Sequence, residues 1–140
     1  MEVKNLVKYF PVHEGILRRH VADIKAVDGV SFTIKEGETM SLVGESGCGK
    51  TTVSQTMLRL VEPTSGEAFF RGVNIFDTTG EELKQLRRKI QIVFQDPYTS
   101  LDPRMPVGDA IGEGLKVHNI GNPKERFDIV LSAMKQVGLE

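Results

Sequence analysis

Eight consecutive residues, 44–51, have the types and spacing needed to bind a chain of phosphates. They read Gly-Glu-Ser-Gly-Cys-Gly-Lys-Thr and match G-x-x-x-x-G-K-[ST] at every fixed position. The glycines allow successive backbone N–H groups to turn inward around a triphosphate, where a Cβ would block the turn or the approach. Lys50 can reach the β and γ phosphates, and the Thr51 hydroxyl can bind Mg²⁺. The motif predicts a phosphate-binding loop, or P-loop.

The segments on either side have the sequence patterns of the strand and the helix that such a loop connects. Residues 39–43 form a short, mostly apolar run, typical of a strand buried in a parallel sheet. After the loop, Val53, Met57, Leu60 and Val61 recur at helical spacing, and the pattern ends before Pro63. The positive N-terminal end of this helix would face the phosphates.

Four other residues, which lie in the P-loop, in a later loop and at the end of the first predicted strand, each allow two interpretations. Cys48 is either a small filler residue or a thiol made reactive by Lys50 and the helix N-terminus. Gln95 is either a plain loop residue or a side-chain carbonyl near Mg²⁺ and an attacking water. Tyr9 and Phe10 are either core aromatics or a stacking surface for a nucleobase.

Two further patterns are better explained without a function. Residues 77–80 match D-x-x-G, but they overlap a helix cap and the chain contains no guanine-reading tetrapeptide. His13, His20 and His118 are scattered, with no carboxylate or cysteine at ligand spacing, so we expect no metal site there.

Composition predicts an ordinary globular domain. The chain has 140 residues, of which 39% are hydrophobic and 26% charged, with a net charge of −1. The near-zero charge gives no electrostatic reason to expect nucleic acid as a partner. A single cysteine, no signal-peptide pattern and no apolar run near 18 residues favour a cytoplasmic location.

The remaining patterns predict an α/β fold in which an antiparallel sheet precedes a parallel core that begins near Thr39. Strands are expected at 3–9 and 30–34, with a polar, irregular stretch at 11–25 between them, and then at 67–73, 74–76 and 90–94. A helix is expected to begin with a Thr79–Glu82 capping box. Two more follow, one around 107–118 and one begun by an Asn122–Glu125 capping box with Pro123 in its first turn.

The chain resembles the ATP-binding subunits of ATP-binding cassette (ABC) transporters over essentially its whole length. Residues 30–38, leading into 44–52, carry this resemblance together with Pro-Thr-Ser-Gly at 63–66. The segment 93–103, Val-Phe-Gln-Asp-Pro-Tyr-Thr-Ser-Leu-Asp-Pro, is similar to the Q-loop of the oligopeptide and dipeptide importer branch.

The resemblance implies roles for individual residues. Gln95 becomes the Q-loop glutamine, which positions water and Mg²⁺, and Phe10 fits the adenine-stacking aromatic better than Tyr9. Lys50 and Thr51 hold phosphate and Mg²⁺, and Thr52 supports the phosphates. The ATP-binding set is then Phe10, Gly44, Glu45, Ser46, Gly47, Cys48, Gly49, Lys50, Thr51 and Thr52.

The resemblance also implies a division of the chain and a set of partners. Residues 1–38 would be mainly the antiparallel β subdomain, 39–104 the P-loop core through the Q-loop, and 105–140 the start of the helical subdomain. The intact protein would pair with a second ATP-binding subunit and with membrane permease subunits. It would hydrolyse ATP at the inner face of the cell membrane to import peptides or a similar solute.

The signature motif, the Walker B strand and the catalytic glutamate of the family do not occur in these residues. We therefore expect the N-terminal part of a longer cassette, which binds ATP but is inactive alone. The alternatives are a non-catalytic nucleotide-binding module or a different P-loop enzyme, such as a kinase or a GTPase. No role is predicted for the stretch at 11–25.

Overall fold

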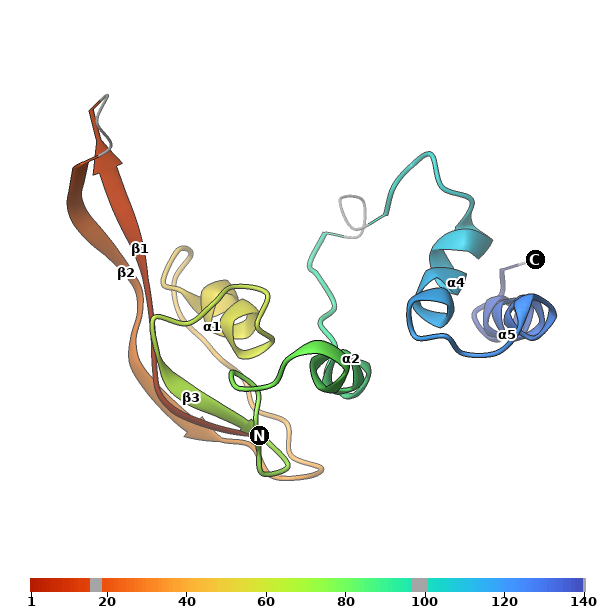
Figure 1. Cartoon of the computed structure of the whole chain (residues 1–140), viewed down its shortest axis with the longest axis horizontal. Coiled ribbons are helices and arrows are strands. Elements are labelled where there is room, and N and C mark those ends of the chain that lie inside the picture. The colour runs from red at the N-terminus through yellow and green to blue at the C-terminus, as the bar shows by residue number, and fades with distance from the viewer. Residues whose placement is uncertain (16–18, 97–100, 140) are drawn as a thin grey trace. The chain divides into compact units, whose positions relative to one another are not determined.

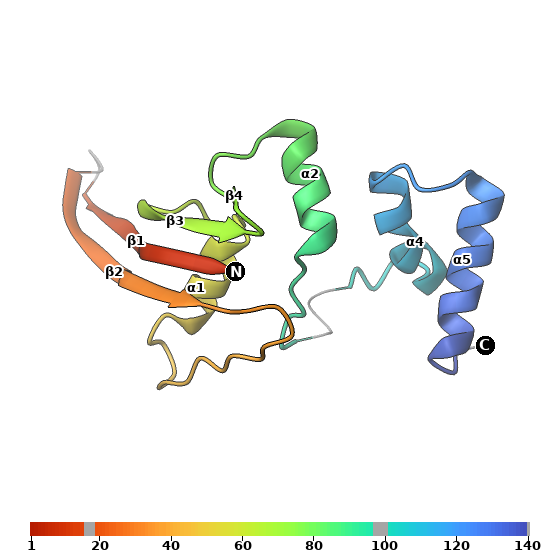
Figure 2. The ribbon, with the colours of Figure 1, turned by 90° about the horizontal axis from the view of Figure 1, so that it is seen from below.

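A computed structural model describes residues 1–15, 19–96 and 101–139. They form two compact units, Met1–Ile92 and Val93–Glu140, each of which is described by itself. Figure 1 and Figure 2 show the elements of both. The functional boundaries expected after residues 38 and 104 stay predictions. Part of the Q-loop segment, residues 97–100, lies outside the described residues.

The first unit is built on an antiparallel sheet. Its strands are β1 (Glu2–Glu14), β2 (Arg19–Thr33), β3 (Ser65–Phe70) and β4 (Val73–Asn74), in the order β2-β1-β3-β4. β1 pairs with β3 only as far as Val7, but with β2 along almost its whole length. The two long strands therefore continue beyond β3 as a two-stranded extension, which Figure 1 shows. We call residues 8–14 and 19–27 the β1–β2 arm.

The arm corrects the prediction that 11–25 is irregular. Pro11 pairs with Asp23, and Val12 pairs with Ala22, across a regular antiparallel ladder. The prediction was wrong because both faces of the arm are largely exposed, so its polar residues do not alternate with a buried apolar set.

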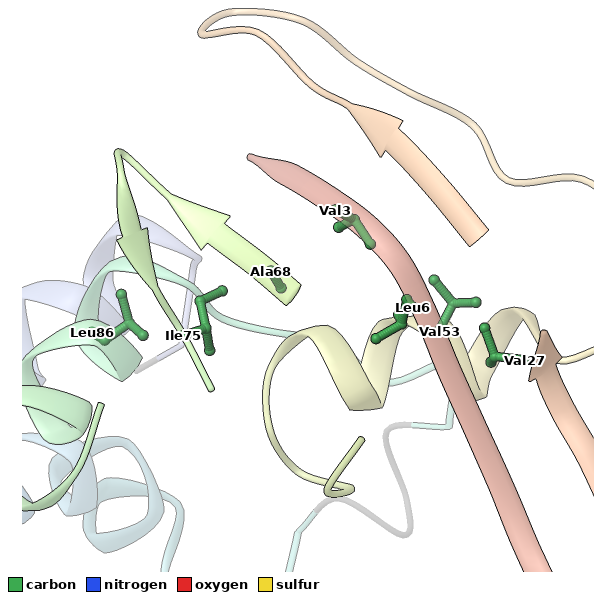
Figure 3. Close-up of a cluster of buried hydrophobic side chains, with 7 residues drawn as sticks. All are labelled: Val3, Leu6, Val27, Val53, Ala68, Ile75 and Leu86. Atoms are coloured by element: carbon green, nitrogen blue, oxygen red, sulfur yellow. The ribbon is translucent and has the colours of Figure 1, made fainter. Parts of the chain in front are cut away.

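The core of the first unit depends on a bulge in β1. Val3 and Leu6 are both almost completely buried, although they are three positions apart and a regular strand would turn them to opposite faces. Asn5 has a φ of 45°, and the register of β1 shifts here against both neighbouring strands. The extra residue returns Leu6 to the buried face. Figure 3 shows this cluster, which consists of Val3, Leu6, Val27, Val53, Ala68, Ile75 and Leu86.

Helix α1 (Lys50–Met57) follows the P-loop and packs Val53 into this core. The helix ends at Met57, with Leu58 as its C-cap, which is earlier than the apolar pattern predicted. It stops there because Arg59 adopts a left-handed conformation with φ 51°. Arg59 N donates to Thr56 O and Leu60 N donates to Gln55 O, the two hydrogen bonds of a Schellman motif. Local backbone geometry therefore stops the helix before Pro63.

Helix α2 (Gly80–Lys89) has Thr79 at its N-cap, as predicted, but the Thr79 side chain makes no capping hydrogen bond. The predicted Thr79–Glu82 capping box is therefore wrong. The last turn of the helix is basic and contains Arg87, Arg88 and Lys89. Cations there interact favourably with the helix dipole.

Residues 39–43 and 90–94, which were expected to form strands of a parallel core, are not assigned to any strand. Among the described residues, the only sheet is the antiparallel one. Val43 and Val93 are 88% and 96% exposed. The prediction of strands at 39–43 and 90–94 is therefore wrong for the described residues, because an apolar run forms a strand only where a neighbour accepts and donates its backbone hydrogen bonds.

The second unit contains two helices, α4 (Val107–Val117) and α5 (Pro123–Gln136). The Asn122 capping box is confirmed: Asn122 Oδ1 accepts from the backbone N–H groups of Lys124 and Glu125, both at 3.0 Å. A Cβ added to Gly112 would lie 3.4 Å from Val130 Cγ2, so the helices are in close contact at this point. Within the described residues, none of the helices has the length and apolar content of a membrane span.

Candidate nucleotide-binding site

The P-loop surrounds the ammonium group of Lys50. Lys50 Nζ donates to the backbone oxygens of Gly44 at 2.7 Å and Glu45 at 2.6 Å, and lies 3.4 Å from Cys48 Sγ. These contacts hold the cation at the mouth of an exposed loop. A phosphate chain requires a positive charge fixed beside the backbone N–H groups of such a loop.

Gly49 fixes the loop to the sheet. It is the N-cap of α1, with φ 95°, a conformation that other residues rarely adopt. A Cβ built on it would lie 2.1 Å from the backbone oxygen of Ala26 on β2. The start of α1 therefore approaches β2 so closely that only glycine fits, which explains the requirement for glycine before the lysine of the motif.

The first turn of α1 contains the other residues that the sequence predicts to bind phosphate and Mg²⁺. It contains no acidic residue, so nothing opposes the positive end of the helix dipole. Thr51 is exposed and Thr52 is half-buried in this turn. Mg²⁺ in nucleotide sites usually takes one or two protein ligands besides phosphates and water, and the Thr51 hydroxyl fits that need. Among the described residues, no three His, Cys, Asp or Glu side chains gather to hold a metal without a nucleotide.

Cys48 lies inside the loop, where its thiol is exposed. Its sulfur is 3.4 Å from Lys50 Nζ, so both sequence-based interpretations of the thiol stay open. Because of this short distance, any group bound to the Cys48 thiol would lie beside Lys50.

The two aromatic residues of β1 point to opposite faces of the arm. Lys8 pairs directly with Val27, which is buried against α1, and its ammonium group lies 4.8 Å from the centre of the Phe10 ring. Directly paired residues share a face of a sheet, as do positions two apart along a strand. Phe10 therefore lies on the α1 face, and Tyr9 lies on the other. Neither belongs to the buried core.

Tyr9 is held on its own face by two charged residues of β2. Its hydroxyl donates to Asp28 Oδ1, and Lys25 Nζ lies 5.2 Å from its ring centre and 3.5 Å from Asp28 Oδ2. The hydrogen bond lowers the pKa of the Asp28 carboxyl and raises the pKa of Tyr9. The negative charge of Asp28 raises the pKa of Lys25. These contacts fix the orientation of β1 at the residue before Phe10.

Gln95 belongs to the second unit and is exposed in a bend after residues 90–94. The P-loop belongs to the first unit. The role of Gln95 beside Mg²⁺ therefore stays a prediction.

A family model described as "ABC transporter" matches residues 27–140, which is most of the chain. The chain belongs to the ABC transporter family. The match includes the P-loop, α1 and the Q-loop segment on which the resemblance was based.

Curated relatives of this ABC chain are named as ATP-binding proteins of transport or import. It is 46% identical to the oligopeptide transport ATP-binding protein AppF of Bacillus subtilis over 140 residues, which is 99% of this chain and 43% of the relative. It is 48% identical to the glutathione import ATP-binding protein GsiA of Pectobacterium atrosepticum over 140 residues, which is 100% of this chain and 22% of that relative. The chain therefore spans less than half the length of either protein.

Solved ABC cassettes have the same fold. The dimeric, post-hydrolysis structure of the ATP-binding cassette MJ0796, bound to ADP and Pi, superposes with a TM-score of 0.75 at 29% identity. The match covers 99% of this chain and 57% of the MJ0796 chain. The cbiO1 structure from Clostridium perfringens, part of the cbiONQ complex, gives a TM-score of 0.67 at 28% identity, covering 99% and 50%. The α/β cassette fold class and the expected branch of the family are thereby confirmed.

Sequence reasoning missed two contributors to the site. Ala26 meets Gly49 through its backbone oxygen, which no side-chain pattern can reveal. Lys8 lies over Phe10, and the signal available for it was the spacing of two residues along a strand.

Proposed function

We propose that this chain binds Mg-ATP as the nucleotide-binding part of an ABC importer's ATP-binding subunit. The observation that carries the proposal is the P-loop itself, in which the Lys50 ammonium group is held by two loop carbonyls at the start of α1. The relatives named for oligopeptide transport and for glutathione import favour peptides or a similar small solute as the cargo of the intact transporter.

The site residues divide the work as follows. Lys50 and the backbone N–H groups of residues 44–52 neutralise the phosphates, and Thr51 binds Mg²⁺. Phe10 stacks against the adenine, and Gln95 positions the attacking water. The intact subunit pairs with a second ATP-binding subunit and with permease subunits at the inner face of the membrane, where ATP hydrolysis drives import. We also propose that residues 1–38 are mainly the antiparallel β subdomain, residues 39–104 the P-loop core through the Q-loop, and residues 105–140 the start of the helical subdomain.

These 140 residues supply phosphate contacts but no carboxylate that the family uses as a general base. We therefore propose that the chain binds Mg-ATP without turning it over. The alternative function is a nucleotide-binding module that never hydrolyses ATP. Such a module would behave in the same way in isolation.

Equilibrium binding and phosphate release, measured on the same preparation, test the proposal. Mg-ATP binding is expected with wild type, and its loss is expected with Lys50→Met. Lys89→Met, at the exposed end of α2, serves as the charge-matched control and is expected to bind normally. Metal-dependent phosphate release that Lys50→Met abolishes would contradict the inactive state. Equal binding by Lys50→Met and Lys89→Met would contradict the site.

A further inference from the structure

The face of the β1–β2 arm next to α1 carries an exposed aromatic ring with a cation on it. Phe10 is 39% exposed, and the ammonium group of Lys8 lies 4.8 Å from its ring centre. A cation at this distance over a ring is attracted by the ring quadrupole. Lys8 thus covers one face of the ring, which leaves a base only the opposite face to stack on.

An exposed apolar side chain stands next to this ring. Ile24 pairs directly with Phe10 across the arm and is 60% exposed. It precedes by two residues Ala26, whose backbone oxygen lies against Gly49. Two residues of a strand span about 7 Å, so β2 leads from the start of the P-loop helix to Ile24 over a short distance.

We propose that Lys8 and Ile24 complete, with Phe10, the platform that holds the base of the nucleotide. This inference rests on the proposed function and extends it to two residues. Lys8 is a positioning residue: it holds the Phe10 ring on the α1 face without touching the phosphates. Ile24 contacts the base from the neighbouring strand and removes apolar surface from water when the nucleotide binds.

Contacts on the opposite face of the arm help to orient the Phe10 ring. Tyr9 is tied to Asp28 and Lys25, which fixes β1 immediately before Phe10. With the backbone held there, the orientation of Phe10 depends mainly on its own side-chain rotation, which Lys8 restricts. Because stacking is tolerant of base identity, the platform should accept adenine and guanine alike.

Lys8→Met, which keeps the side-chain length and removes the charge, tests the inference. Lys4→Met is the matched control, since Lys4 makes an equivalent contact with the Phe69 ring at 5.0 Å. Lys4 pairs with Glu67, one position beyond the buried Val3–Ala68 pair, and so lies on the opposite face of the sheet. Each variant is titrated with Mg-ATP and with Mg-tripolyphosphate, which has the phosphates but no base.

We expect Lys8→Met to raise the Kd for Mg-ATP by up to about two- to fivefold, because the ring then loses the cation–π contact that orders it before the nucleotide binds. The Kd for Mg-tripolyphosphate should not change, and Lys8→Arg should restore ATP binding. Lys4→Met should leave both constants unchanged. Ile24→Ala should raise the Kd for Mg-ATP about threefold without affecting tripolyphosphate. Val21→Ala, at another exposed apolar residue of the arm, should affect neither.

Several results would overturn the inference. If Lys8→Met weakens both ligands equally, Lys8 acts only as a nearby charge. An equal loss in Lys4→Met would show that the ring contact has no special role. If wild type binds Mg-ATP no more tightly than Mg-tripolyphosphate, the base has no platform, although the proposed phosphate site stands. Failure of wild type to bind either ligand would refute the proposed function itself.

Discussion

Replacing Gly49 by alanine should destabilise the chain far more than the same change at Gly47. Both glycines lie in the P-loop and both have positive φ, 95° and 82°. A Cβ on Gly47 would meet nothing within 4 Å, whereas a Cβ on Gly49 would lie 2.1 Å from the Ala26 backbone oxygen. Gly47→Ala is therefore a control for the backbone strain alone.

The expected magnitudes follow from these two differences. A left-handed conformation costs a residue with a Cβ about 1–2 kcal/mol, and this cost applies to both variants. At Gly49, the oxygen must also move by about 1 Å to reach an ordinary contact. Ala26 belongs to β2, which is hydrogen-bonded to β1, so its backbone has little freedom to yield. Forcing extra atoms into a packed site costs about 1–3 kcal/mol more, so we expect about 2–5 kcal/mol in total for Gly49→Ala.

Urea unfolding, followed by far-UV circular dichroism, measures the difference. With a slope of about 2 kcal/mol per molar urea, an extra 2 kcal/mol lowers the midpoint of Gly49→Ala about 1 M below that of Gly47→Ala. Whole domains are stable by only about 5–15 kcal/mol, so a loss of about 5 kcal/mol would leave Gly49→Ala largely unfolded in buffer. Equal midpoints for the two variants would refute the close approach of α1 to β2.

Three other predictions concern the cap of α5, the P-loop thiol and the Tyr9 contact. Asn122→Ala should lower the unfolding free energy by about 1 kcal/mol, because it removes two capping hydrogen bonds, whereas Thr79→Ala, which removes none, should change it little. Saturating Mg-ATP should slow alkylation of Cys48, and equal rates with and without nucleotide would place the thiol away from the ligand. The lowered pKa of Asp28 means that its bond with Tyr9 stabilises the fold above the ordinary carboxyl pKa, and that this stabilisation is lost as the pH falls through the folded value. Asp28→Asn should remove that part of the acid dependence, as measured by thermal unfolding between pH 2 and pH 6.

Features that depend on neighbours along the chain were predictable from the sequence. The P-loop was one, because its glycines, its lysine and the following helix lie within a few residues of each other. The capping box of α5 was another, since Asn122 and Glu125 need only the first turn of a helix to meet. The resemblance of the same local motifs to ABC subunits led to the family, which the comparisons then confirmed.

Features that depend on pairing between distant segments were decided only by the tertiary structure. The bulge at Asn5 determines that Val3 and Leu6 share a face, and further register shifts determine which of Tyr9 and Phe10 faces α1. The strands of the arm pair although their sequences show no alternation of apolar and polar residues. Conversely, residues 39–43 have a strand-like apolar sequence but pair with no strand among the described residues. The physical reason is the same in each case. A strand acquires its hydrogen bonds, its register and the direction of its side chains from the strand beside it, and the chain's local composition does not specify that neighbour.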